Sequence, residues 1–183
     1  MSRDKTKRNK QRGSTKRLLW GGAAILLVGS VVAVFLITYQ PAQGESAPIL
    51  GAGHVPDGTI VRVEGSDPPS SGDHYEDPAP RGFYETPVDD GHLIHNLEHG
   101  YIVIWYDCTQ LEDAACQTLK SDIQQTIKAL ASYKLVAAPR DGMETPIALT
   151  SWGWIDKLEQ YDKPRIEAFI RAHHKQAPEP EGP

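Results

Sequence analysis

The sequence predicts an α+β protein in which a single N-terminal transmembrane helix is followed by one compact domain with a mostly antiparallel sheet. An uncharged apolar run, residues 18–39, follows a strongly basic N-terminus. The roughly 140 residues beyond it are enough for one domain with one hydrophobic core. Within them, strand-like runs and helical periodicities follow in the order strand, helix, strand, strand, helix. This order is typical of helices packed on a sheet.

The apolar run has the dimensions of a membrane span. Its 22 residues would form a helix about 33 Å long, close to the roughly 30 Å hydrocarbon core of a bilayer. Residues 1–17 hold eight Lys or Arg and one Asp, which predicts a cytoplasmic tail and an extracytoplasmic remainder. The apolar core of a cleaved signal peptide is the alternative, but it normally has about 7 to 15 residues. The pattern therefore favours a single-pass, uncleaved anchor in the cell membrane.

Charge separates the two sides of this span. The whole chain has 19 basic and 24 acidic residues, so the part after residue 17 has 11 and 23, a net charge of −12. The basic tail lies directly before the span, where it sets topology and contacts anionic lipid. An acidic extracytoplasmic part is unsuited to nucleic acid. We therefore predict the membrane as a partner and no nucleic acid.

The beginning of the extracytoplasmic part lacks helical periodicity. Residues 40–53 are rich in Gly, Pro, Ala and Ser and predict a linker. The domain is expected to cover residues 54–176, with residues 177–183 as a disordered tail. Thr59–Val63 has the β-branched alternation of a first strand. The proline-rich loop that follows, residues 64–80, is long enough to be either functional or disordered.

Residues 91–106 contain the densest group of possible ligands. His92, His95 and His99 stand at i, i+3 and i+7, so a helix would place them on one face, opposite its leucines and isoleucine. Asp89 or Asp90 could cap the start of this helix, and Gly100 could end it in a left-handed conformation. A buried strand over residues 101–107 is expected to follow.

The two cysteines, Cys108 and Cys116, predict a disulfide because they lie outside the cytoplasm. A helix beginning at Thr109 with a capping box would put Cys116 two turns away and beyond disulfide reach. A helix beginning at Asp113 places Cys116 in its first turn. We therefore expect the bond together with the later helix start.

Periodicity predicts the remaining elements. A helix extends to about Ser132, strands cover residues 133–138 and 145–152, and a last helix begins at Pro164 with His173 on its inner face. A thioredoxin-like arrangement is an option, because Pro146 stands where that fold keeps a proline. There is no Cys-x-x-Cys motif, which disfavours redox exchange.

The first functional hypothesis is a metal site in which His95 and His99 on one helix face meet His74 from the proline-rich loop. A fourth ligand or a supporting residue would come from three further candidates, namely Glu98, His92 and His54. Several imidazoles at an extracytoplasmic site suit Zn or Cu, and Met143 nearby would favour Cu. In the alternative interpretation, the same histidines only cap the helix and hydrogen-bond the loop.

Two other hypotheses remain open. The order His95-x-x-Glu98-His99 matches the inverted zinc-peptidase motif, in which the glutamate activates water. Against hydrolysis, the predicted helix has only about two turns. The other hypothesis is a metal-free interaction module for a protein of the cell envelope. Its surface would be aromatic, although the same side chains are also expected in the core: Tyr101, Trp105, Trp152 and Trp154.

Four stretches carry a resemblance to a known family. They are PPSSGDHY at 68–75, HNLEHGYIVIWY at 95–106, IALTSWGW at 147–154 and RIEAFIRAHH at 165–174. They resemble bacterial membrane-anchored extracytoplasmic proteins grouped as domain of unknown function 3105. The positions that match its motifs are His74, His95, Glu98 and His99, whereas Ser70 replaces a usual threonine and Asp73 a frequent proline. The resemblance implies no established activity.

Overall fold

The computed structural model describes residues 44–61 and 64–182. The predicted cytoplasmic tail 1–17 and membrane span 18–39 lie outside the described residues. Within the described part, every helix is too short or too polar to cross a bilayer. The anchor and the cellular location therefore stay predictions.

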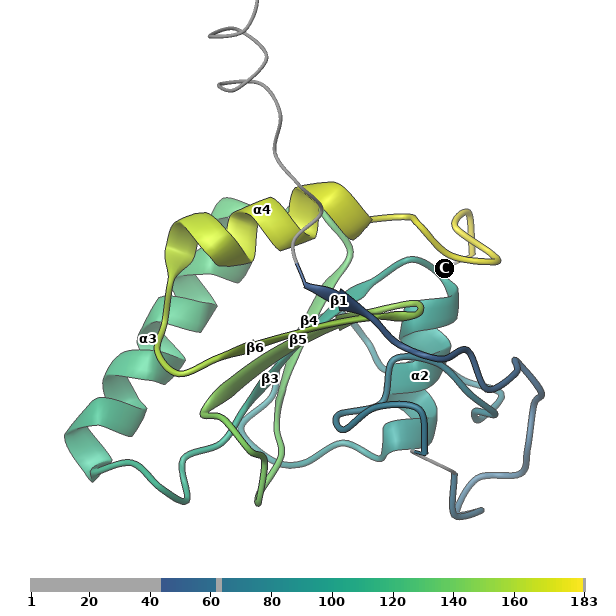
Figure 1. The fold of residues 1–183 in the computed structure, drawn as a ribbon, viewed down its shortest axis with the longest axis horizontal. Helices are drawn as coiled ribbons and strands as arrows, with labels where there is room; N and C mark the ends of the chain where they lie inside the picture. The colour runs from purple at the N-terminus through teal and green to yellow at the C-terminus, as the bar shows by residue number, and fades with distance from the viewer. Residues whose placement is uncertain (1–43, 62–63, 183) are drawn as a thin grey trace, which may run out of the picture. The chain divides into compact units, whose positions relative to one another are not determined.

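The described residues form a mixed α+β domain with three helices and one six-stranded sheet (Figure 1). The strand order in the sheet is β1-β6-β5-β3-β4-β2. Along the chain the elements are β1 (Glu45–Ser46), β2 (Gly82–Phe83), α2 (Asp90–Glu98), β3 (Ile102–Tyr106), α3 (Asp113–Ala129), β4 (Leu135–Pro139), β5 (Ile147–Ser151), β6 (Trp154–Leu158) and α4 (Lys163–His173).

Alternation along the central strand β3 divides the core into two layers. Ile102, Ile104 and Tyr106 point to the face covered by α3 and α4, whereas Val103 and Trp105 point to the face covered by α2. All five residues are buried, as expected for a strand with helices on both faces. Figure 1 shows α2 on the side of the sheet away from α4.

The predicted core order is present with one strand more. The strands β3 and β4 are parallel and are joined through α3, because parallel neighbours need a crossover connection, usually a helix. The strand β5 pairs with β3 in the antiparallel sense. The added strand, β6, forms a hairpin with β5 through a turn of two residues, 152 and 153. Gly153 has φ +72°, a conformation that such tight hairpin turns require.

The sheet is more mixed than predicted. β2–β4 and β3–β4 are parallel, whereas β3–β5, β5–β6 and β1–β6 are antiparallel. The predicted strand at Thr59–Val63 is not formed by its described part, residues 59–61, and residues 62–63 lie outside the described residues. Thr59 instead accepts a hydrogen bond from the Tyr75 hydroxyl through its carbonyl oxygen, at 3.0 Å. The local β-branched pattern is therefore used in a loop.

The disulfide and the late helix start are confirmed. Cys108 and Cys116 are bonded, with their Cα atoms 5.4 Å apart. The helix α3 begins at Asp113, so Cys116 lies in its first turn. This agreement follows from the limited reach of a disulfide, which a helix starting at Thr109 would exceed.

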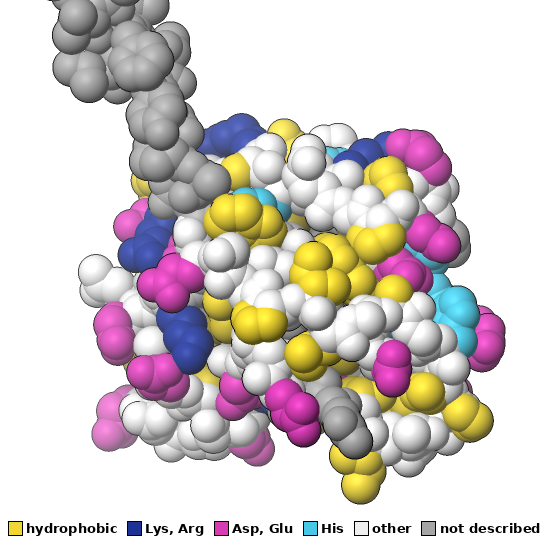
Figure 2. Space-filling view, turned by 45° about the vertical axis from the view of Figure 1, so that its right-hand side comes forward, with side chains coloured by type: hydrophobic (Ala, Val, Ile, Leu, Met, Phe, Trp, Pro, Cys, Tyr) yellow, Lys and Arg dark blue, Asp and Glu magenta, His cyan; other side chains and the backbone are white. Residues whose placement is uncertain are grey.

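The segment predicted to be a linker contains an edge strand. Glu45 and Ser46 form β1 and pair with β6, and Ala47 N–H donates to the Gly153 carbonyl at 2.8 Å. The exposed large hydrophobic residues of the described chain belong to this segment and the loop after it, namely Ile49, Leu50 and Ile60. Figure 2 shows a face on which hydrophobic side chains gather.

Candidate metal centre

The helix α2 separates an apolar face from a face that carries histidines, as its spacing predicts. Leu93, Ile94 and Leu97 are fully buried and pack in the core layer with Trp105. Asp89 is the N-cap residue, although its side chain makes no capping hydrogen bond. After the helix, Gly100 has φ +75° and turns the chain into β3. The apolar face of the helix thus packs against the sheet, and the opposite face carries the histidines.

The proline-rich loop brings His74 to this face. Two backbone hydrogen bonds join it to the preceding segment: Val55 N–H donates to the His74 carbonyl at 2.8 Å, and His74 N–H donates to the Gly53 carbonyl at 2.9 Å. They place the ring of His54 4.8 Å from that of His74, centroid to centroid. Tyr75 N–H, in turn, donates to the Gly91 carbonyl at 3.2 Å. The loop is therefore hydrogen-bonded both to the segment that carries His54 and to the first turn of α2.

Three imidazoles each place their Nδ1 atom against a backbone carbonyl oxygen. The Nδ1 atoms of His74, His95 and His99 lie 2.9, 2.7 and 3.2 Å from the backbone carbonyl oxygens of Gly72, Tyr75 and Glu179. A carbonyl only accepts hydrogen bonds, so each Nδ1 is assigned the proton. In a neutral ring this leaves Nε2 with a lone pair, which is the tautomer that a metal-binding histidine requires. At the 2.7 Å between the Nε2 atoms of His95 and His99 two lone pairs repel, so without an ion these two rings share a proton.

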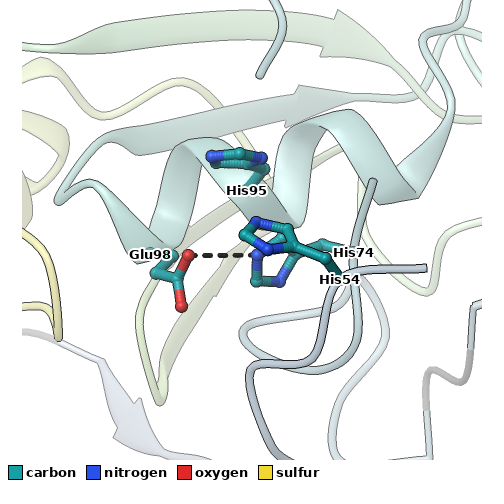
Figure 3. Close-up of side chains that lie close together, drawn as sticks. All are labelled: His54, His74, His95 and Glu98. Carbon is teal, nitrogen blue, oxygen red and sulfur yellow. Dashed lines mark ion pairs between the residues drawn. The ribbon is translucent and has the colours of Figure 1, made fainter. Parts of the chain in front are cut away.

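The Nε2 atoms converge with a buried carboxylate. His95 Nε2 lies 2.7 Å from His99 Nε2, and His74 Nε2 lies 3.0 Å from Glu98 Oε2. Ligand atoms of His54, His74, His95 and Glu98 all lie within 4.8 Å of one another (Figure 3). The ring of His54 is exposed, whereas the other three side chains are buried. The group is thus open to solvent on one side.

The electrostatics of the group favour a cation. Glu98 is only 5% exposed, and a buried carboxylate is costly without a compensating charge. Burial lowers the pKa of His95, which keeps its ring neutral, although the hydrogen bond to Tyr75 opposes this shift. His74 Nε2 is close enough to Glu98 for an ion pair, yet it is a buried atom without hydrogen-bond geometry to any partner among the described residues. A bound cation would satisfy both atoms.

The dimensions fit a transition metal after a small adjustment. Zinc bonds to histidine nitrogen and carboxylate oxygen are about 2.0–2.2 Å long, so two ligand atoms of one tetrahedral ion lie about 3.4 Å apart. The ligand atoms of the group lie within 4.8 Å of one another. Binding one ion would therefore draw them together, and the exposed His54 ring has room to move.

Three predicted ligands lie outside this group of four. His99 contacts it through the Nε2 atom of His95, at 2.7 Å. His92 points elsewhere on α2, where its Nδ1 lies 2.6 Å from the Asp77 carbonyl oxygen. Met143 is a buried core residue beside Trp105, and its N–H donates to Asp107 beyond the far end of β3. The helix spacing predicted His92 on the same face as His95 and His99. The Tyr75 ring, whose centroid lies 4.9 Å from that of His92, packs against it and keeps it away from the group.

The aromatic surface proposed for a metal-free interaction module is not exposed. Tyr101, Trp105 and Trp152 are 7%, 1% and 8% exposed, and Trp154 is partly buried against the core. Apolar strands with helices on both faces bury these rings. A partner in the cell envelope stays a prediction, without this surface.

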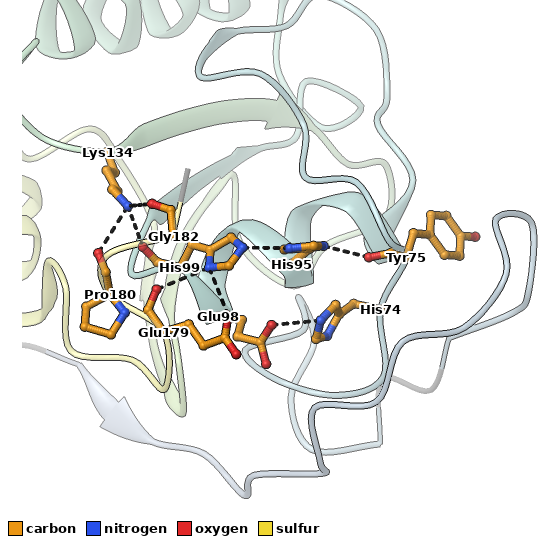
Figure 4. Close-up of polar contacts among 9 residues, drawn as sticks. All are labelled: His74, Tyr75, His95, Glu98, His99, Lys134, Glu179, Pro180 and Gly182. Carbon is orange, nitrogen blue, oxygen red and sulfur yellow. Dashed lines mark hydrogen bonds and ion pairs between the residues drawn. The ribbon is translucent and has the colours of Figure 1, made fainter.

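Sequence reasoning did not identify the residues that orient the histidines. They act through backbone carbonyls, which any residue type supplies, so the sequence carried no signal for Gly72, Tyr75 or Glu179. Lys134 was also missed, although it reaches the carbonyl of His99 with its Nζ at 3.1 Å. Figure 4 shows the contacts of Tyr75, Glu179 and Lys134 around the site.

Comparisons with known proteins give one match. No curated protein and no solved structure matches the chain. The sequence model of a family described as "Protein of unknown function (DUF3105)" matches residues 54–183, which include all the residues of the candidate metal centre. The chain therefore belongs to the DUF3105 family.

Proposed function

We propose that this domain binds one transition-metal ion through His74, His95 and Glu98, with His54 or His99 as the fourth ligand. One observation carries the proposal: three imidazoles donate through Nδ1 to backbone carbonyls, and the ligand atoms of two of them, His74 and His95, lie within 4.8 Å of those of His54 and Glu98. Metal-bound histidines are held in this way by their outer partners. Histidines that only stabilise the fold have no need to converge on a buried carboxylate.

Zinc is the preferred ion. Three nitrogen ligands and one carboxylate form a common tetrahedral zinc set. The case for copper depended on a soft sulfur ligand, and Met143 packs in the core instead. The donor set thus favours Zn²⁺ over Cu²⁺ by ligand chemistry, and the metal content of the protein decides between them.

We also propose the location and a finer fold description. The basic tail and apolar run support a membrane-anchored extracytoplasmic domain, in which a disulfide is stable. The central order β4-β3-β5-β6, with Pro146 directly before β5, supports a thioredoxin-like arrangement. Hydrolysis by the His-x-x-Glu-His motif stays a prediction, because Glu98 lies among the candidate ligands.

The metal content of the full chain tests this function. The protein is purified in mild detergent without a histidine tag or chelator, and zinc and copper are measured by elemental analysis. We expect close to one equivalent in the wild type and a loss in His74→Ala and His95→Ala. His92→Ala is the matched control, because it removes a histidine of the same helix that lies outside the group, and it should keep the metal.

Two outcomes would contradict the proposal. A stably folded wild type that takes up no zinc or copper, even after incubation with either ion, would show that the histidines are architectural. Equal loss of metal in His92→Ala and His95→Ala would show that the ion is bound elsewhere or that the effect comes from unfolding.

A further inference from the structure

The C-terminal residues 176–182 lie across the end of α2. Lys175 has φ +63°, and its N–H donates to the Gly100 carbonyl at 3.0 Å. Glu179 N–H donates to the Glu98 carbonyl at 3.0 Å, and Ala177 packs against the core layer that contains α2. Composition predicted a solvated tail for most of this segment, which we name the C-terminal strap.

Lys134 fastens the strap. Its ammonium group donates to the backbone carbonyls of His99, at 3.1 Å, and Pro180, at 3.2 Å, and also to that of Gly182. An ammonium group has three protons, so three carbonyl acceptors use its full capacity. One cation therefore joins the end of α2 to two points of the strap (Figure 4).

The strap fixes the ring of His99. The Glu179 carbonyl oxygen lies 3.2 Å from His99 Nδ1, closer than the carboxylate oxygen of Glu179 at 3.8 Å. Gly182 lies directly on the ring, because a Cβ atom at that position would overlap the imidazole. With Nδ1 held by the strap, Nε2 faces His95 at 2.7 Å.

We propose that the C-terminal strap and Lys134 position His99 as a ligand of the metal site, and thereby slow release of the ion. This inference rests on the proposed metal-binding function. Lys134 and Glu179 are positioning residues, since they act on the metal through His99. Removing an outer partner of a histidine ligand typically weakens metal binding about 10- to 100-fold.

The test compares full-length variants and one truncated chain with two readouts. Lys134→Met removes the ammonium group that hydrogen-bonds the strap, and a chain ending at Lys175 lacks the strap itself. Lys134→Arg keeps a cation at this position, so its rates of His99 modification and zinc release should lie closer to those of the wild type than the rates of Lys134→Met do. Glu181→Gln is the control, because it removes the exposed ion pair with Lys175 and leaves the contacts to His99 in place. The readouts are modification of His99 by diethyl pyrocarbonate in metal-free protein, measured by mass spectrometry, and the rate of zinc transfer to a chromogenic chelator.

We expect faster modification of His99 and about 10-fold faster zinc release in both strap variants, with no change in Glu181→Gln. If the wild type binds zinc and both variants release it at the wild-type rate, the strap proposal is overturned while the metal function stands. If the wild type binds no metal, the proposed function fails, and unchanged modification of His99 would separately show that the strap does not hold this ring.

Discussion

Asp107 links the end of β3 to the turn before β5. It is 2% exposed, and its carboxylate accepts hydrogen bonds from Thr109 N–H and Oγ1, both at 2.7 Å, and from Met143 N–H at 2.9 Å. Burial alone would raise the pKa of Asp107, but these hydrogen bonds outweigh it and lower the pKa. Its contribution to stability is therefore present above the pKa of the unfolded state and is lost as pH falls through the folded-state pKa.

We expect Asp107→Asn to lower the free energy of unfolding by about 1–3 kcal/mol at pH 7, because an amide group faces donors that require an acceptor. The difference from wild type should shrink below about pH 4, where the carboxylate of the unfolded wild type takes up a proton, and should vanish below the lower pKa of the folded state. Denaturant unfolding of the full chain at several pH values measures this. Asp141→Asn, an exposed neighbour, is the control, and an equal loss in both variants would contradict the assignment.

At the scale of elements, Gly91 controls how closely α2 approaches the proline-rich loop. A Cβ atom at Gly91 would lie 2.6 Å from the Tyr75 ring, and the Tyr75 carbonyl orients His95. In an ordinary helix, Gly→Ala is stabilising by about 1 kcal/mol. Here the overlap should reverse that sign.

Gly91→Ala is therefore expected to lower the melting temperature and to weaken zinc binding. The physical reason is that displacement of Tyr75 moves the carbonyl that holds His95. Thermal unfolding and a zinc titration of the full chain check both effects. A variant with raised stability and unchanged zinc affinity would show that the loop adapts freely to the added methyl group.

The sequence predicted the elements that have strong local signals. The spacing of His95 and His99 and the stop at Gly100 predicted α2, and disulfide reach predicted the start of α3 at Asp113. It missed β6, whose five residues give too short a pattern; the signal that could have found it is the two-residue turn at Gly153. The strand predicted at Thr59–Val63 was the opposite error, since its described residues form a loop. Local β propensity was overridden there by tertiary contacts.

The candidate site was predicted less completely than the fold. His74, His95, Glu98 and His99 were predicted as ligands from helix spacing and the motifs, and the structure places them close together, with His99 beside His95. Their arrangement depends on contacts across large sequence separations, such as the 80 residues between His99 and Glu179. No local pattern encodes such contacts, so the strap and the position of His54 could not be derived from the sequence.

At the scale of the whole molecule, the candidate site brings together two parts of the chain, the irregular segments before β2 and the helix α2, that are not connected through the sheet. His54 and His74 come from irregular segments before β2, whereas His95 and Glu98 lie on α2, which packs on the sheet. Among the described residues, one backbone–backbone hydrogen bond joins these segments to α2, between Tyr75 and Gly91, and the others use side chains of α2 such as Asn96. A metal ion would add bonds between the two parts, and a ligand that binds only the folded state stabilises what it connects.

Removal of the metal should therefore loosen the irregular segments and spare the sheet. We expect faster amide hydrogen exchange at residues 48–55 and 68–75 when the full chain is treated with a chelator, with β3 and β5 unchanged, because local opening follows the weakest connections. Exchange measured by mass spectrometry with and without zinc tests this. His92→Ala should respond as the wild type does, whereas His74→Ala should show no difference between the two conditions. A uniform change across β3 and β5 would instead mean that the ion stabilises the domain as a whole, and the site would then be part of its folding core rather than a connection between two segments.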